Sequence, residues 1–270
     1  MNTFTVNGST MRYLDQGEGP VLLMGHSYLW DHTMWAPQIE VLSQHYRCIV
    51  PDLWAHGGSD AAPSQTLTLK DYAKDLLALM DHLAIDSFSV VGLSVGGMWG
   101  AELAALAPER VKSLVMMDTF VGLEPEVTHA KYFGMLDAIT AAELVPAPIV
   151  DAVVPMFFAK DAETASPELV ARFRASLSEL KGQRAVDVAT IGRKIFGRRE
   201  MFDDIEQFTL PTLIMVGMED TPRPPLEAQL MHDTIKHSEY VLIPKAGHIS
   251  NLEQPQFVTD KLVEFLAKVH

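Results

Sequence analysis

The sequence predicts an α/β fold: a mainly parallel sheet with helices on both faces and an inserted all-helical cap. Short runs of consecutive apolar residues are typical of strands buried on both faces, and stretches with helical spacing separate most of these runs. This alternation indicates parallel pairing, because a parallel pair needs a crossover connection. The segment 121–207 breaks the alternation, since it contains no convincing strand.

The chain begins with a predicted hairpin. Residues 3–6 and 10–14 alternate around the turn Asn7-Gly8-Ser9, a pattern that indicates two antiparallel strands. The core strands expected after the hairpin are 21–24, 48–50, 88–91, 114–117, 213–216 and 240–243. The helices expected in the core, from apolar residues spaced by three and four, are 35–42, 69–83, 97–107 and 254–269.

The segment 121–207 is expected to form the cap. It carries large, adaptable apolar side chains, and proline and glycine divide it into amphipathic stretches at about 126–141, 147–159, 167–180 and 184–196. Ligand sites in open α/β sheets lie at the carboxyl ends of the strands, so we expect a lid over that edge. The alternative is a helical layer that only thickens the core. The predicted domains are a first core part at 1–120, the cap, and a second core part at 208–270.

Composition and charge exclude several classes of partner. The chain has 270 residues, of which 35 are acidic and 21 basic, for a formal net charge of −14; binding to nucleic acid is disfavoured because it uses basic patches. No stretch approaches the roughly 18 apolar residues of a membrane span, and the N-terminus lacks the basic start of a signal peptide. The single cysteine, Cys48, lies in a predicted buried strand and rules out an internal disulfide. We therefore expect a cytoplasmic protein with no membrane and no nucleic-acid partner.

A tight turn between a strand and a helix carries the most informative motif. Gly92-Leu93-Ser94-Val95-Gly96 directly follows the apolar run 88–91 and precedes the alanine-rich stretch 97–107. Such a turn holds the serine at its apex in a strained backbone conformation, with the hydroxyl exposed. The two glycines remove the Cβ atoms that would collide in so sharp a reversal. Ser94 is therefore the predicted nucleophile.

The predicted partners of Ser94 lie far along the chain. A serine hydroxyl needs a base that is itself oriented by a carboxylate. His248 follows the strand 240–243 and Asp220 follows the strand 213–216, so both lie on loops at carboxyl strand ends. We expect His248 to be the base and Asp220 the acid, in the chain order serine, acid, histidine. Two other acids stay open: Glu219, which points the opposite way in an extended segment, and Asp118, which ends the preceding strand.

Two backbone N–H groups are expected to bind the oxyanion that acyl transfer produces. One belongs to Val95, directly after the nucleophile. The other belongs to Tyr28, in the loop 25–30 that follows the strand 21–24. His26 in the same loop is expected to brace the backbone and not to act as a second base.

The motifs together resemble the α/β-hydrolase superfamily, and the resemblance covers essentially the whole chain. The matching pieces are 25–26, 51–59, 92–97, 107–111, 217–220 and 246–248. The sequence departs from the family pattern at Ser27 and at Ala55, where glycine is usual, and the first departure bears on the assignment of Tyr28. Ser94 stands where haloalkane dehalogenases and epoxide hydrolases carry an aspartate. The chain is therefore most similar to the small serine esterases and lactonases, among them enol-lactone and acyl-homoserine-lactone hydrolases of this fold.

The resemblance implies a carboxylic-ester hydrolase that forms an acyl-enzyme on Ser94 and uses no cofactor. Its expected partner is a small-molecule ester or lactone, and no metal is expected because the sequence lacks the His-x-His-x-Asp-His cluster of metal-dependent lactonases. The apolar content of the cap predicts a pocket for a short to medium acyl group, lined by Trp30, Phe133, Met156 and Phe157. Three alternatives would use the same triad: a ligand-sensing receptor of this fold, a perhydrolase and a carbon–carbon bond hydrolase.

Overall fold

One eight-stranded sheet forms the centre of the computed structural model, which describes all 270 residues. Its strands are β1 (Asn2–Val6), β2 (Ser9–Gln16), β3 (Val21–Gly25), β4 (Arg47–Pro51), β5 (Phe88–Leu93), β6 (Val111–Met117), β7 (Thr212–Gly217) and β8 (Glu239–Ile243). Their order across the sheet is β1-β2-β4-β3-β5-β6-β7-β8. The hairpin strand β2 pairs antiparallel with both β1 and β4. The other neighbours in the sheet, β4, β3, β5, β6, β7 and β8, pair parallel. The predicted fold class is confirmed.

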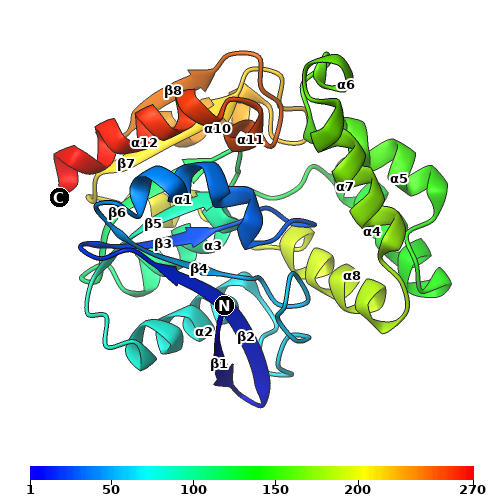
Figure 1. The fold of residues 1–270 in the computed structure, drawn as a ribbon, viewed down its shortest axis with the longest axis horizontal. Helices are drawn as coiled ribbons and strands as arrows, with labels where there is room; N and C mark the ends of the chain where they lie inside the picture. The colour runs from blue at the N-terminus through cyan, green and yellow to red at the C-terminus, as the bar shows by residue number, and fades with distance from the viewer.

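Helices cover both faces of the sheet. One face is covered by α1 (Ala36–Leu42) and α12 (Pro255–Val269), and the other by α2 (Leu69–His82), α3 (Val95–Leu106) and α10 (Pro225–Thr234). Figure 1 shows α1 and α12 on one side of the strands and α2 on the opposite side. Because both faces are covered, the central strand β5 is buried along its whole length, which explains its continuous apolar sequence.

Local sequence determines where these helices begin. The α2 helix begins after Thr68, whose side chain accepts the backbone N–H of Asp71, while the Asp71 carboxylate accepts the backbone N–H of Thr68. This reciprocal capping box satisfies donors that the first turn would otherwise leave unpaired. The α10 helix was not predicted, because the proline-rich sequence before it indicates a stiff loop. Pro225 in fact occupies the first turn of α10, where its missing N–H costs nothing.

The segment between β6 and β7 consists of helices joined by loops and contains no strand, only an isolated bridge between Leu144 and Lys181. It contains α4 (Glu126–Ala142), α5 (Ala147–Val153), the 3₁₀ turn η2 (Val154–Phe157), α6 (Ala162–Ala165), α7 (Pro167–Glu179), α8 (Gln183–Phe196) and α9 (Phe202–Ile205). The stretch predicted as one helix over 147–159 changes to 3₁₀ geometry at Pro155, because proline cannot donate to the helical ladder. The expected helical cap is thus present, while its limits at 121 and 207 stay a prediction.

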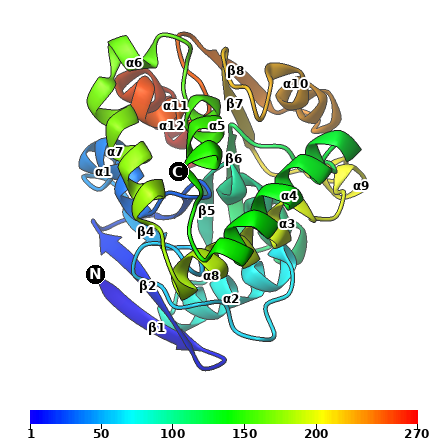
Figure 2. The same ribbon diagram turned by 90° about the vertical axis from the view of Figure 1, so that its right-hand side faces the viewer.

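The cap lies over one end of the strands, as Figures 1 and 2 show from two directions. Its buried side chains continue the two cores of the sheet and do not form a core of their own. Val188 and Ile191 of α8 join the core on the α2 and α3 side, while Phe173 of α7 joins the core on the α1 and α12 side. The space between cap and sheet is therefore where a ligand can be enclosed. None of the helices is both long enough and apolar enough to span a membrane.

Substituting Gly92, at the end of β5, is expected to disrupt the fold. A Cβ added to Gly92 would lie 2.2 Å from the carbonyl carbon of Gly96, and because that atom is backbone, Gly92→Ala should lower the free energy of unfolding by about 3 kcal/mol or more. Gly134, in the middle of α4, has nothing within 4 Å of an added Cβ. Gly134→Ala should therefore raise the free energy by about 0.5–1 kcal/mol. Urea unfolding measures both, and a Gly92→Ala variant as stable as the wild type would contradict this account.

Candidate active site

Ser94 lies at a sharp reversal between β5 and α3. Its backbone has φ of 56° and ψ of −118°, a conformation that a residue with a side chain adopts only under strain. The reversal is fixed on both sides: the Ser94 N–H donates to the carbonyl of Met117 at 2.8 Å, and the Thr119 hydroxyl donates to the Ser94 carbonyl at 2.6 Å. A Cβ on Gly96 would lie 2.3 Å from the Gly25 carbonyl oxygen. The turn therefore needs glycine at this position and packs directly against the end of β3.

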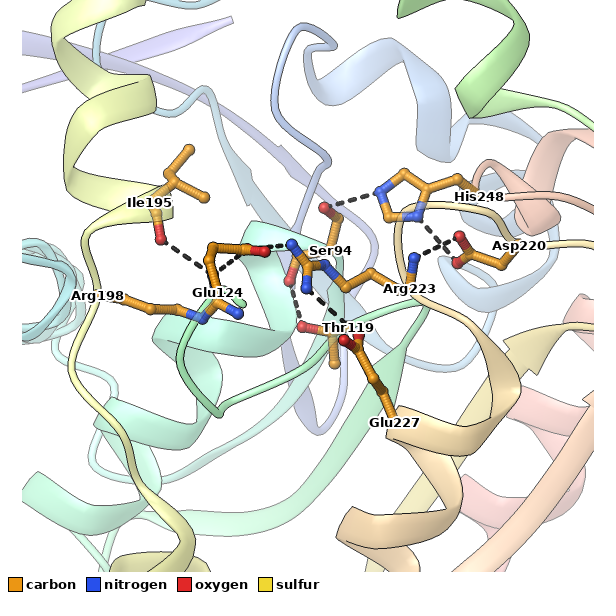
Figure 3. Close-up of polar contacts among 9 residues, drawn as sticks. All are labelled: Ser94, Thr119, Glu124, Ile195, Arg198, Asp220, Arg223, Glu227 and His248. Carbon is orange, nitrogen blue, oxygen red and sulfur yellow. Dashed lines mark hydrogen bonds and ion pairs between the residues drawn. The ribbon is translucent and has the colours of Figure 1, made fainter. Parts of the chain in front are cut away.

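His248 joins the serine to a carboxylate. Its Nε2 lies 2.9 Å from the Ser94 hydroxyl, and its Nδ1 lies 2.9 Å from Oδ2 of Asp220. Since Asp220 can only accept when ionised, Nδ1–H donates to it and Nε2 is left to accept the serine proton. The second carboxylate oxygen of Asp220 accepts the backbone N–H of Arg223 at 2.9 Å. Figure 3 shows the three side chains in line.

The two other acids that the sequence left open make different contacts. Glu219 accepts the backbone N–H of Lys160 in the cap at 3.0 Å. Asp118 is buried and accepts the backbone N–H of Gly217 and the Ser250 hydroxyl. Burial, with Asp220 nearby, raises the pKa of Asp118 well above its ordinary value. Neither acid contacts His248.

The two expected oxyanion donors have free backbone N–H groups. Val95 is the first residue of α3, and its N–H has no protein partner. The N–H of Tyr28 is also without a partner, although those of its neighbours Ser27 and Leu29 are both engaged. The Tyr28 side chain makes a separate contact: its hydroxyl donates to the carbonyl of Val188 in α8 at 2.9 Å. Oxyanion binding by these two N–H groups stays a prediction.

Two buried neutral histidines brace the loop that carries Tyr28. His26 bonds the carbonyl of Ser27 through Nδ1 and accepts the N–H of Leu53 through Nε2. His56 likewise bonds the carbonyl of Trp54 through Nδ1, and its Nε2 accepts the N–H of Leu29 at 3.1 Å. Burial lowers the pKa of both rings, that of His56 to about 3, so each can accept as well as donate. The sequence assigned the bracing role to His26 only; His56 lies in the quoted motif 51–59 but its contact was not foreseen.

A largely apolar cavity of about 90 Å³ opens beside Ser94 and His248. Met156 and Phe157 line it, as the sequence predicted, and the edge of the Phe157 ring faces the His248 ring at 5.3 Å between centroids. Trp30 and Phe133 do not line this cavity, so their placement in the pocket was wrong. The Trp30 ring stacks on Phe173 at 4.9 Å and lines a neighbouring pocket, which shares Leu29 with the cavity beside Ser94. Phe133 points out from α4, where it stacks on His129 and lies under the guanidinium of Arg193.

A family model described as alpha/beta hydrolase fold matches residues 20–255. The chain belongs to the α/β-hydrolase family. It is 25% identical to 3-oxoadipate enol-lactonase 2 of Acinetobacter baylyi over 258 residues, which cover 94% of this chain and 92% of that protein.

Among solved structures, this α/β-hydrolase superposes on a thermophilic esterase from Thermogutta terrifontis with a TM-score of 0.89 and 29% identity, covering 99% of this chain and 97% of the other. It superposes on the enol-lactonase from Burkholderia xenovorans with a TM-score of 0.88 and 27% identity, covering 98% and 100% of the two chains. The resemblance to esterases and enol-lactone hydrolases of this fold is confirmed. The chain is an esterase- or lactonase-like hydrolase.

A buried ion cluster supports the acid loop of this α/β-hydrolase. Arg198 and Arg223 both donate to the same carboxylate oxygen of Glu124, and all three side chains are at most 4% exposed. Arg223 also donates to Glu227 and, through its backbone, to Asp220 (Figure 3). Because Glu124 and Arg198 flank the cap helices, the cluster joins the cap to the loop that holds Asp220. The sequence analysis missed these residues, since nothing local marks a pairing between positions 99 residues apart.

Replacing the two buried aspartates is expected to have different consequences. Asp220→Asn removes the charge that holds the imidazole in the required tautomer, so the hydrolysis of p-nitrophenyl acetate should fall about 10⁴-fold. Asp118→Asn leaves the bond between Asp220 and His248 in place, because the Asp118 side chain bonds only Gly217 and Ser250, and should change the rate by less than about tenfold. Initial rates of the two purified variants provide the comparison. Equal losses in both would show that Asp220 is not the specific partner of His248.

Proposed function

We propose that this protein is a serine hydrolase that cleaves carboxylic esters, lactones included, through an acyl-enzyme on Ser94. The observation that carries the proposal is the hydrogen-bonded series Ser94–His248–Asp220 at the edge of a largely apolar cavity. A serine that is strained, hydrogen-bonded to an imidazole and open to a cavity has the features of an activated nucleophile. The names of the relatives support the same reaction class.

The reaction follows from the protons that each group can hold. His248 Nε2 takes the Ser94 proton while the serine oxygen attacks the ester carbonyl, and the carbonyl π electrons move to oxygen to form the tetrahedral oxyanion. The oxyanion collapses, the carbon–oxygen bond to the alcohol breaks, and the imidazolium gives its proton to the departing alkoxide. Water, deprotonated by His248, then attacks the acyl-enzyme, and Ser94 leaves with the proton returned. Asp220 stays ionised throughout and stabilises the imidazolium.

Two free backbone donors would stabilise the oxyanion in both steps. The N–H groups of Val95 and Tyr28 have no protein partner to lose, so they can bind the developing charge without reorganisation. Each such donor contributes about 3–4 kcal/mol of transition-state stabilisation in enzymes of this kind. The tie from Leu29 N–H to the neutral His56 keeps the backbone after Tyr28 in place.

Lactones belong to the proposed substrate class because a cyclic ester presents the same carbonyl and leaving oxygen. In a lactone the alcohol stays attached to the acyl-enzyme, so the released product is a single hydroxy acid. Titration of acid released from an acyl homoserine lactone or an enol-lactone measures this activity directly. It separates a lactonase from an esterase that acts on open-chain esters alone.

Ser94→Ala should abolish turnover while leaving the fold intact. The hydrolysis of p-nitrophenyl acetate should fall by at least about 10⁴-fold, because no nucleophile remains to form the acyl-enzyme. Diethyl p-nitrophenyl phosphate should add one diethylphosphoryl group to the wild-type protein and none to Ser94→Ala, as mass spectrometry of the intact chain would show. Ser89, a buried serine on β5 that bonds His270 and Ser113, supplies the control: Ser89→Ala should still be labelled. Retention of most of the rate in Ser94→Ala would remove the proposal.

The size of the cavity predicts a preference for short acyl groups. A cavity of roughly 150 Å³ holds a benzene molecule, so about 90 Å³ leaves space for an acyl chain of about four carbons. The kcat/KM for p-nitrophenyl butyrate should exceed that for the octanoate by roughly tenfold or more. Met156→Ala should narrow this ratio, because Met156 lines the cavity, whereas Met218→Ala should not, because Met218 is 54% exposed outside it. If Met156→Ala left the ratio of the two kcat/KM values unchanged, the acyl group would not bind in the cavity that Met156 lines.

A further inference from the structure

A short cap segment, residues 157–160, is fastened to both loops that carry the partners of Ser94. The carbonyl of Phe157 accepts the N–H of Ile249 at 3.1 Å, directly after His248. The N–H of Lys160 donates to Glu219 at 3.0 Å, directly before Asp220. Between them, the N–H of Ala159 donates to Oε1 of Glu253 at 2.8 Å. Three consecutive polar contacts thus join this part of the cap to the core.

Glu253 differs from the other contacts because it also binds the histidine loop. Its second carboxylate oxygen, Oε2, accepts the N–H of Gly247 at 2.7 Å, and Gly247 directly precedes His248. The two backbones are in close contact here, since a Cβ on Gly247 would lie 2.4 Å from the carbonyl carbon of Phe158. The Glu253 carboxylate therefore binds the N–H of Ala159 in the cap with one oxygen and, with the other, the N–H of Gly247 next to His248.

We propose that Glu253 is a positioning residue that sets the place of His248 and couples it to the docking of the cap segment 157–160. The proposal rests on the function proposed above. Phe157 adds to the coupling, because its side chain lines the cavity and contacts the His248 ring while its carbonyl is part of the same fastening. Glu253 touches no reacting atom, so its effect on catalysis passes through the backbone of residue 247.

The ionised form of Glu253 lowers the stability of the folded protein, which argues that this residue has a role other than stabilising the fold. No lysine or arginine pairs with it, and it faces other acids: Glu219 after β7, Asp161 before α6 and, on the sheet side, Asp118. Burial, with Glu219 and Asp161 nearby, raises the pKa of Glu253 to about 7. Its ionised form therefore costs stability as pH rises from the ordinary carboxyl range through 7. Only that form accepts from both N–H groups, because protonation turns one oxygen into a donor.

The pH dependence of a matched pair of variants tests the proposal. In Glu253→Gln the amide NH₂ faces one of the two N–H groups, as the protonated acid would, so kcat for p-nitrophenyl acetate at pH 8 should fall roughly tenfold. The ratio of wild-type to variant kcat should shrink toward one as pH falls to 6, where the wild-type Glu253 becomes protonated. Glu219→Gln is the control: the Glu219 side chain holds the same cap segment but bonds no N–H of the histidine loop, and its backbone bond to Ala246 is kept in the variant. At pH 8, where Glu253 is ionised with or without the charge of Glu219, the ratio of wild-type to Glu219→Gln kcat should stay near one.

A ratio for Glu253→Gln that is the same at pH 6 and pH 8 would mean a merely structural role and would overturn the proposal. A loss in Glu219→Gln equal to that in Glu253→Gln would do the same. A second measurement needs neither variants nor turnover: amide hydrogen exchange of the wild-type protein, corrected for intrinsic rates. Protection of Gly247 and Ala159 should decrease between pH 8 and pH 6, while that of Lys160 should not. Unchanged protection of Gly247 would refute the proposal even if Ser94 proves catalytic, and decreased protection would support it even if no ester is cleaved.

Discussion

The strained backbone at Ser94 is the constraint on which the rest of the site depends. A residue with a side chain at φ of 56° is unfavourable by itself, so the surrounding structure must hold it there. The close approach of Gly96 to the end of β3 and the bonds to Met117 and Thr119 do so. These contacts come from three adjacent strands of the parallel sheet, β3, β5 and β6. The sheet therefore holds Ser94 in its strained conformation through contacts that form only when all three strands are paired.

The same sheet brings together the partners of Ser94. The loops after β5, β7 and β8 all emerge at one edge because these strands run parallel, and that edge is where α/β folds place their ligand sites. The loop after β3 reaches the same edge and is fixed by two neutral histidines, whose second nitrogens accept backbone N–H groups. Burying neutral rings avoids the cost of burying charges. The donors needed for an oxyanion can then be left free without loosening the loop.

The fold and the central part of the site could be predicted from the sequence because their signals are local. Continuous apolar runs mark the buried strands, and glycines around Ser94 mark the reversal. The α10 helix was missed because Pro225 reads as loop while helix N-termini accept it. Phe133 and Trp30 were misplaced because helical spacing does not give the rotation of a cap helix about its axis or the side of a loop from which a ring projects. Long-range pairings such as Arg198 with Glu124 have no local signal at all.

The position of each acid, and not the total negative charge of the site, determines which carboxylate can orient the imidazole of His248. Asp118 bonds Gly217 and Ser250, and Glu253 bonds Gly247, yet only Asp220 bonds the imidazole. Asp118 lies close to Asp220 instead, and burial together with that neighbour raises the pKa of Asp118. The two carboxylate oxygens of Glu253 each accept a backbone N–H group, one from Ala159 and one from Gly247. The imidazolium of the proposed mechanism forms only transiently, so in the resting protein no cation pairs with the ionised Glu253. That carboxylate therefore lowers the stability of the fold, and in our proposal it contributes instead by holding the backbone next to His248 in place.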